Sequence, residues 1–296
     1  MYSRKNALHY HAMVLPGILL LLLFSVVPIG FAVIAFQNFK PGRGITGSEW
    51  VGLENFHYLF QLPDSRLIFF NTIFLAVLKI VANLIVPLVF ALLLNEVRVR
   101  FLRKSIQTIV YLPHFISWVL LATIFFDVFS LEGIVNQALG MFGVDPVLFY
   151  ASNRWFPAII VATDVWKEFG FNAIVYLAAL TGINPALYEA ASIDGASRFR
   201  QLWHVTLPGV KTTVILLATL ALGNVMNANF DQIFNMYNPL VYQSSDIIDT
   251  YVYRVGLNDL QYSLGTAVGL LKSVVSFILV VLSYVLASRF AGYRIF

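Results

Sequence analysis

The chain has 296 residues, of which 59% are hydrophobic and only 11% are charged. Water-soluble domains average roughly 25% charged residues, so this composition excludes an ordinary soluble fold and predicts an all-α, polytopic membrane protein. The formal net charge is +4, but the basic residues are scattered through short loops, which argues against a nucleic-acid partner. There is no cysteine, which excludes disulfides, iron–sulfur clusters and thiol nucleophiles.

Six stretches are apolar over the roughly 20 residues that a helix needs to cross a bilayer, and they predict six transmembrane helices. The gaps between them are too short for a second soluble domain, so we expect residues 1–296 to form a single membrane domain. The first stretch resembles a signal peptide, but it is long enough to span and we interpret it as a retained helix. The N-terminal helix is expected at 13–36 and the core helices at 69–291, with spans at Met13–Phe36, Phe69–Asn95, Ile106–Phe129, Phe156–Leu180, Thr212–Phe230 and Ala267–Ala291.

The distribution of Lys and Arg predicts the orientation of these spans, because positive residues accumulate in cytoplasmic loops. With both termini in the cytoplasm, eleven basic residues lie inside, five lie outside and three lie within spans. The loop between the fourth and fifth spans is then cytoplasmic. The inside group is Arg4, Lys5, Arg98, Arg100, Arg103, Lys104, Arg198, Arg200, Lys211, Arg289 and Arg294; the outside group is Lys40, Arg43, Arg66, Arg154 and Arg254; Lys79, Lys167 and Lys272 lie within spans.

The loop at 184–208 is polar and patterned, although it lies between two long apolar segments. Asn184 can cap a helix with Pro185 at its first position, and residues 187–193 can form about two turns. Asp194-Gly195 predicts a turn. A helix–turn–helix on the cytoplasmic surface follows from these signals.

The second half of this loop begins at Ser197, which can cap another short helix. Phe199 and Leu202 share a face of that helix, and Leu207-Pro208 is expected to open the fifth span. One interpretation is an interfacial amphipathic helix that packs on lipid headgroups. The other is a surface that docks a partner protein, which the Ala-Ala pair and the glycine favour because they permit close approach and a bend.

The sequence Glu189-Ala-Ala-x-x-Asp-Gly195, with Leu207-Pro208 downstream, resembles the coupling loop of binding-protein-dependent ABC permeases. The similarity is greatest to the carbohydrate-importing group related to the maltose-type permeases, and it extends from about residue 12 to the C-terminus. The tyrosine-rich segment at 235–242 resembles permeases for polysaccharide fragments. Further matching motifs are Trp50-Val-Gly-Leu-Glu-Asn-Phe56, Asn71-Thr72, Tyr111-Leu-Pro-His-Phe-Ile-Ser-Trp118 and Ala178-Ala-Leu180.

This resemblance implies a type I ABC importer permease fold and an oligosaccharide-transporting subunit of the bacterial inner membrane that works by alternating access. It implies a second homologous permease, an ATPase homodimer at the loop and an extracytoplasmic sugar-binding protein as partners, within membrane lipid. No phosphate-binding Gly-x-x-x-x-Gly-Lys-Ser/Thr motif occurs, so we expect ATP and Mg²⁺ to bind the ATPase, with no enzyme activity, cofactor or metal here. The expected coupling residues are Glu189, Ala190, Ala191, Asp194, Gly195, Arg198, Phe199, Leu207 and Pro208.

Three charged residues, Asp164, Lys167 and Glu168, lie within the predicted fourth span. A charge at the bilayer centre costs at least about 2.5–3.5 kcal/mol, so we expect Asp164 to pair with Lys167 and Glu168 to face water or another helix. These residues either line the substrate path or form a structural ion pair. A different class of protein, a self-contained secondary transporter, would use them as an ion relay; a scaffold that only recruits a soluble partner is a third reading.

Asn224, Asn227 and Asn229 cluster at the end of the predicted fifth span, where unsatisfied amides are costly. Amides beside aromatic rings suit a sugar site, whereas asparagines that bond neighbouring helices are the structural alternative. The resemblance adds Gly170, Phe171 and Asn172 to the substrate path. Met226 and Ala173 depart from the group's pattern, which leaves open that the partner permease holds the substrate.

Pro87 and Pro113 predict kinks in the second and third spans. The five histidines are dispersed and show no metal-binding spacing.

Overall fold

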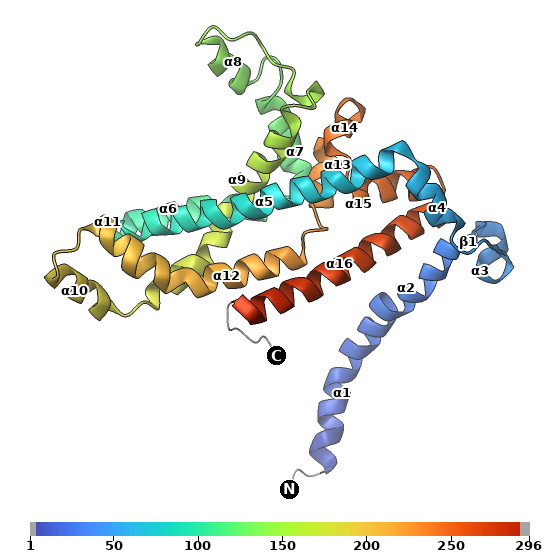
Figure 1. Cartoon of the computed structure of the whole chain (residues 1–296), viewed down its shortest axis with the longest axis horizontal. Coiled ribbons are helices and arrows are strands. Elements are labelled where there is room, and N and C mark those ends of the chain that lie inside the picture. The colour runs from blue at the N-terminus through green and yellow to red at the C-terminus, as the bar shows by residue number, and fades with distance from the viewer. Residues whose placement is uncertain (1–3, 291–296) are drawn as a thin grey trace. The chain divides into compact units, whose positions relative to one another are not determined.

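The structure is a computed structural model that describes residues 4–290 (Figure 1). Ala291, Arg294 and both chain ends, to which several predictions extend, lie outside the described residues. The backbone separates into two compact groups, one up to Ser65 together with Tyr251–Leu271, the other Arg66–Thr250 together with the residues from Lys272 onward. The prediction that residues 1–296 form a single membrane domain stays a prediction.

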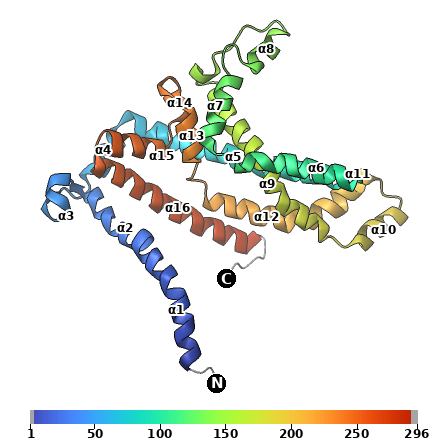
Figure 2. The same cartoon turned by 180° about the vertical axis from the view of Figure 1, so that it is seen from behind.

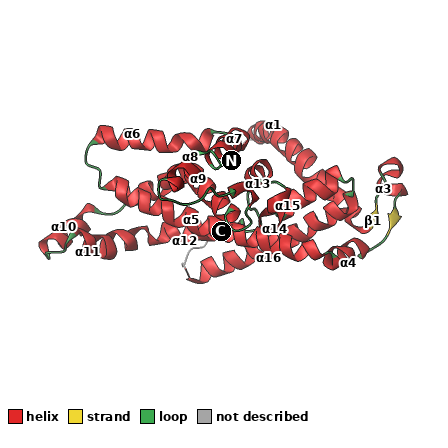
Figure 3. Ribbon diagram, turned by 90° about the horizontal axis from the view of Figure 1, so that it is seen from above, coloured by secondary structure: helices red, strands yellow, loops and turns green. Residues whose placement is uncertain are grey.

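The first group begins with the apolar helical run His9–Phe36, which matches the predicted first span. Only 6% of its most apolar stretch is buried, as expected of a helix that lipid or another subunit covers. Two short antiparallel strands follow and appear in yellow in Figure 3; Gln37 lies opposite Trp50. The elements are α1 Arg4–Leu21, a π-helix Leu22–Val26, α2 Val27–Gly30, 3-10 helices Phe31–Phe36 and Pro41–Arg43, β1 Gln37–Asn38, α3 Gly44–Gly47, β2 Glu49–Trp50, α4 Glu54–Gln61 and a π-helix Val252–Asn258.

The second group contains the long helices that carry the candidate sites. Helices α5, α6 and α12 extend toward the end at which α10 and α11 lie, and α7 leads away to α8 (Figures 1 and 2). Its helices are α5 Pro63–Asn95, α6 Arg100–Tyr111, α7 Trp118–Val128, α8 Ile134–Gly140, α9 Phe156–Thr181, α10 Pro185–Ile193, α11 Arg198–Gln201, α12 Leu207–Gly223, α13 Phe230–Met236 and α14 Tyr242–Ser245; α15 Ile248–Tyr251 and α16 Tyr262–Phe290 contain residues of both groups.

Four helical segments of the described chain are long and apolar enough to cross a membrane, and two bent pairs raise the number to six. This confirms the all-α membrane fold. Each of the six predicted spans has a helical counterpart, although two differ from their expected form. The counterparts are His9–Phe36, Pro63–Asn95, Arg100–Phe115 with Trp118–Val128, Phe156–Thr181 with Pro185–Ile193, Arg198–Gly223 and Tyr262–Val285.

The third span is a broken helix rather than a continuous one. Its two halves meet at an angle of 103°. A 3-10 turn at Leu112–Phe115 contains Pro113, which cannot donate the backbone hydrogen bond that would continue the helix. Ser117 then caps α7 by accepting a hydrogen bond from the backbone N–H of Leu120. Pro87, by contrast, lies inside the uninterrupted helix α5.

The helix of the fifth span differs from the predicted span Thr212–Phe230, whose end was wrong. The helical run begins at Arg198 and ends at Gly223. The short helix that was expected after Ser197 is therefore the first part of this helical run and does not end before Leu207-Pro208. A π-helical segment at Leu202–Thr206 lies just before Pro208, and the wider turn accommodates the proline ring without ending the helix.

The second group has an apolar core where α5, α9 and α12 meet. Tyr176 is fully buried there, and its hydroxyl donates a hydrogen bond to the carbonyl of Leu84 at 3.1 Å. Gly170 permits a close approach of α9 to α6, because a Cβ at this position would lie 2.1 Å from the carbonyl oxygen of Val110. The buried residues of this core are Ala91, Leu94, Ala173, Tyr176, Leu177, Leu180 and Val210.

Candidate functional site

The segment at 184–208 forms a defined helix with a defined end. Asn184 caps α10 by accepting a hydrogen bond from the backbone N–H of Ala186 at 3.0 Å, with Pro185 in the first turn, as predicted. At the other end the backbone N–H groups of Gly195 and Ala196 donate to the carbonyls of Ser192 and Ala191. This is the Schellman arrangement, which needs a left-handed residue, and Gly195 has a φ of +72°.

This geometry explains the spacing of the motif. Gly195 comes four residues after Ala191, just beyond the end of α10. A glycine suits this position because the chain turns there with a positive φ. Leu187, Ala190 and Ile193 are spaced three residues apart, share a face of α10 and are exposed. Ile193 is 87% exposed, and Glu189 beside this stripe is exposed as well. The helix therefore presents an apolar stripe with a neighbouring carboxylate.

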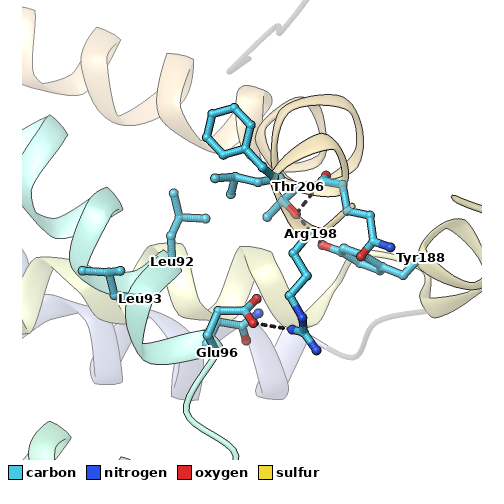
Figure 4. A pocket seen from close by; sticks show the side chains of 10 residues that line it. Leu92, Leu93, Glu96, Tyr188, Arg198 and Thr206 are labelled. Atoms are coloured by element: carbon cyan, nitrogen blue, oxygen red, sulfur yellow. Dashed lines mark hydrogen bonds and ion pairs between the residues drawn. The ribbon is translucent and has the colours of Figure 1, made fainter. Parts of the chain in front are cut away.

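Side-chain contacts join α10 to α11 and to the π-helical segment Leu202–Thr206, and α11 to the end of α5. The Tyr188 hydroxyl lies 3.0 Å from Oγ1 of Thr206, and the amide of Gln201 donates to Oγ of Ser192 at 3.0 Å. Arg198 forms an ion pair with Glu96 at 2.6 Å, in which its side chain remains 68% exposed (Figure 4), and its contact with a partner stays a prediction. The result is a braced surface, not a loose loop.

A cavity of about 490 Å³ lies beneath these contacts, between the end of α5 and the start of α11. Figure 4 shows the Leu92 and Leu93 side chains on one side of it and Tyr188 and Thr206 on the other. Of the predicted coupling residues, only Arg198 and Phe199 line this cavity. Leu207 and Pro208 lie beyond the π-helical segment, within the continuous helix that ends at Gly223.

A second cavity, of about 350 Å³, lies among α5, α9 and the end of α12. Six of the predicted substrate-path residues line it: Asp164, Glu168, Asn172, Asn224, Asn227 and Asn229. The chain between α12 and α13 is not helical, so Asn224 and Asn227 are exposed toward the cavity. Asn229 adopts a left-handed conformation with φ +69° and caps α13 through the backbone N–H of Gln232.

Asp164 pairs with Lys79 rather than with Lys167, so the predicted pairing was wrong. The Nζ–Oδ1 distance is 3.4 Å. Asn83 donates to Oδ2 of Asp164 at 2.8 Å, and Asn229 donates to Oδ1 at 3.3 Å. The Lys79 ammonium also donates to the carbonyl of Ala228 at 2.8 Å and to Oε1 of Gln232. Because tertiary neighbours satisfy the charges, residues three apart on one helix need not pair.

Lys167 and Glu168 belong to a separate network at the break of the third span. Their charged groups lie 3.2 Å apart, and Lys167 donates to the carbonyl of His114 at 2.5 Å. Nδ1 of His114 lies 2.7 Å from Oε2 of Glu168, and its ring stacks on Phe171 at 3.9 Å. Lys167, Phe171 and Gly170 do not line the second cavity. They fix the broken helix against α9.

Sequence reasoning missed three residues of these networks, Lys79, Asn83 and His114. Lys79 and Asn83 are four residues apart in an otherwise apolar helix, which places both on one face opposite Asp164 and Glu168. That spacing was the available signal. Met226 and Ala173, which depart from the carbohydrate-group pattern, are buried and do not line the second cavity. No group of three or more His, Asp or Glu side chains in the described part of the chain is placed to hold a metal.

The segment between α7 and α9 carries a small structured loop. Asn238 donates to the carbonyl of Tyr150 at 2.8 Å, and Asn153 donates to that of Leu240 at 3.1 Å, which ties this loop to the chain after α13. Burial raises the pKa of the Tyr150 phenol. At the end of α8, Met141 and Phe142 are both 85% exposed.

Comparison with known proteins shows where this arrangement occurs. The family described as "Binding-protein-dependent transport system inner membrane component" matches residues 84–292. The chain is 41% identical over 283 residues to the polygalacturonan/rhamnogalacturonan transport system permease protein YteP of Bacillus subtilis strain 168, covering 95% of this chain and 88% of the relative. It is 40% identical over 291 residues to protein LplB of the same organism, covering 98% and 92% of the two chains.

Solved structures show the same fold. A chain of a bacterial ABC transporter involved in the import of the acidic polysaccharide alginate superposes with a TM-score of 0.89 at 37% identity, covering 97% of each chain. A chain of a bacterial alginate ABC transporter in complex with an alginate pentasaccharide-bound periplasmic protein gives 0.89 at 36% identity, covering 99% of this chain and 98% of the other. The chain is thus a permease of the ABC-importer type, and it belongs to the family of binding-protein-dependent transport system inner membrane components.

Proposed function

We propose that this chain is one half of the membrane pore of an ATP-driven importer for oligosaccharides released from polysaccharides. It works beside a second homologous permease, with an ATPase homodimer at α10 and an extracytoplasmic sugar-binding protein on the opposite side. The polygalacturonan/rhamnogalacturonan and alginate relatives support the substrate class. The alginate transporter that was solved with its loaded periplasmic protein supports the binding-protein partner.

The observation that carries this proposal is the shape of α10. A short helix that is capped at both ends presents the stripe Leu187, Ala190 and Ile193 to its surroundings. The Tyr188–Thr206 and Ser192–Gln201 contacts hold it to the chain that follows. An apolar stripe rimmed by charges is typical of a protein interface. The basic residues near α10 favour a cytoplasmic location for this helix, on the side of the membrane where ATP is present. In this orientation both chain termini are also cytoplasmic.

The proposed mechanism is alternating access. ATP and Mg²⁺ bind the ATPase dimer, whose closure moves α10 and, through the continuous helix Arg198–Gly223, the non-helical chain at Asn224–Asn229. The second cavity lies at that point, so its opening is linked to the position of the loop. No catalytic residue, cofactor or metal of this chain takes part.

Transport in proteoliposomes tests the proposal against a secondary transporter that uses Asp164, Lys167 and Glu168 as a relay. We expect uptake to require the ATPase, ATP and the loaded binding protein. Glu189→Lys combined with Gly195→Asp should abolish ATP-driven uptake and the association with the ATPase, whereas Glu132→Lys, a charge reversal on the exposed loop between α7 and α8, should leave the ATPase bound. Uptake that follows a proton or sodium gradient without the ATPase would refute the proposal, and assembly without substrate-dependent ATP hydrolysis would favour a scaffold.

A further inference from the structure

The second cavity offers no uncommitted cation. Among residues 4–290, its wall contains the carboxylates of Asp164 and Glu168 and one cation, Lys79, while Glu168 is paired with Lys167, which does not line the cavity. The other lining polar groups are the neutral amides of Asn83, Asn172, Asn224, Asn227 and Asn229. The exposed fraction is 23% for the Glu168 side chain, against 7% for that of Lys79. A solute in this cavity therefore meets amides and carboxylate before it meets any positive charge.

The one lining cation has no donor left for a ligand. An ammonium group has three N–H donors. Those of Lys79 are committed to the carbonyl of Ala228, to Oε1 of Gln232 and to Oδ1 of Asp164. Lys167 does not line the cavity, and its ammonium is held by the carbonyl of His114 and by Glu168. A carboxylate that entered the cavity would lose its water without gaining an ion pair, which is unfavourable.

The amides, in contrast, are suited to hydroxyl groups. Asn224 and Asn227 are exposed, and each amide offers both donor and acceptor atoms, as a sugar hydroxyl requires. Within residues 4–290, Asn227 uses its Oδ1 to accept from the backbone N–H of Asn229 at 3.4 Å, and no partner is present for its Nδ2. The cavity of about 350 Å³ has room for a sugar residue.

We propose that this cavity is a charge-selective subsite, which binds the hydroxyl face of a neutral sugar unit and rejects a uronate carboxylate. The inference rests on the proposed sugar-import function and deepens it. If the imported oligosaccharide is acidic, its carboxylates lie against the partner permease and not against this chain. Asp164 sets this preference for neutral sugars in two ways: its carboxylate repels a uronate, and its ion pair with Lys79 leaves that ammonium unavailable to the ligand.

The test compares uptake of trigalacturonate with uptake of its methyl ester by the assembled transporter and its binding protein. The variant is Asn227→Lys, which adds an uncommitted cation to the cavity wall. The control is Asn258→Lys, which adds the same charge at an exposed position that does not line the cavity. Because the binding protein is identical throughout, any change in the acid-to-ester ratio belongs to the permease.

We expect Asn227→Lys to raise the acid-to-ester ratio of initial uptake rates at least about tenfold and Asn258→Lys to leave it unchanged. A ratio that is the same in wild type and Asn227→Lys, with both proteins assembled and active, would overturn the subsite while leaving the import function intact. Equal shifts in both variants would also overturn it, since the effect would then be general. If no oligosaccharide supports ATP-dependent uptake by the wild-type assembly, the proposed function fails together with the subsite.

Discussion

Asp164 joins three segments of the second group through its carboxylate. It accepts hydrogen bonds from Lys79, Asn83 and Asn229, which come from α5 and from the turn before α13. A buried ion pair adds little stability over apolar residues, but removing one partner leaves an uncompensated charge. The contact therefore serves to specify how these segments meet rather than to supply a large part of the folding free energy.

The pair predicts a strongly non-additive double-mutant cycle. Asp164→Leu should lower the free energy of unfolding by about 3–5 kcal/mol, because it leaves the Lys79 ammonium buried without its counter-ion. Lys79→Met together with Asp164→Leu should recover most of that loss. Thermal unfolding of the purified protein in detergent measures both effects, and additive losses would contradict the pairing.

Gly170 makes a separate prediction at the same scale. Its missing side chain lets α9 approach the carbonyl of Val110, so Gly170→Ala must push the two helices apart. We expect a loss of about 1–3 kcal/mol from overpacking. Gly17→Ala is the matched control, since the space around that glycine is open. Similar unfolding midpoints for the two variants would show that the close approach of α9 to α6 at Gly170 does not contribute to stability.

Helix α10 acts as a unit because both of its ends are fixed. Asn184 caps its start, and Gly195 ends it in a left-handed conformation that other L-residues adopt at a cost of about 1–2 kcal/mol. The following helix runs without a break from Arg198 to Gly223 and connects this surface to the second cavity. If α10 moves as proposed, its displacement would pass through the turn at 194–197 into this helix, whose end lies at the second cavity.

The conformation at Gly195 predicts a ranking of substitutions. No atom lies within 4 Å of the position of a Cβ, so a substitution there is strained by its φ and not by a clash. Gly195→Asn should retain most of the ATP-dependent uptake, because asparagine tolerates the left-handed region, whereas Gly195→Val should lose most of it. Uptake by the assembled transporter measures the ranking. Equal uptake by both variants would show that transport does not depend on the left-handed conformation at the end of α10.

At the scale of the whole molecule, local sequence signals predicted the helices well, whereas the contacts between distant segments could not be predicted from the sequence. The bounds of α10 follow from Asn184, Pro185 and Gly195, which act on their own neighbours. The contacts of Asp164 with Lys79, Asn83 and Asn229 could not be predicted in this way, because these residues are distant along the chain; Asn83 and Asn229 lie 81 and 65 residues away. Helical spacing within one span favoured Lys167, and only the packing of α5 against α9 shows otherwise.

The fifth span illustrates a second limit. The apolar residues Val225, Met226 and Phe230 continue the hydrophobic pattern beyond Gly223, although the backbone leaves the helix there. At its other end Leu207-Pro208 looks like a helix start, yet the π-helical segment before it lets the helix continue. Residue composition predicts where a span lies, whereas backbone hydrogen bonds decide where its helix ends.

The central claim is that α10 docks on an ATPase, and the absence of native cysteines allows a direct test. Ile193→Cys and Met141→Cys place single thiols at positions that are 87% and 85% exposed, on α10 and after α8. A maleimide–benzophenone reagent is coupled to the thiol in membranes that contain the assembled transporter, and irradiation then joins it to a protein chain within reach, so that the ATPase needs no cysteine. The account predicts a cross-link from Ile193→Cys to the ATPase chain and none from Met141→Cys. A cross-link from Met141→Cys to the ATPase with none from Ile193→Cys would contradict it.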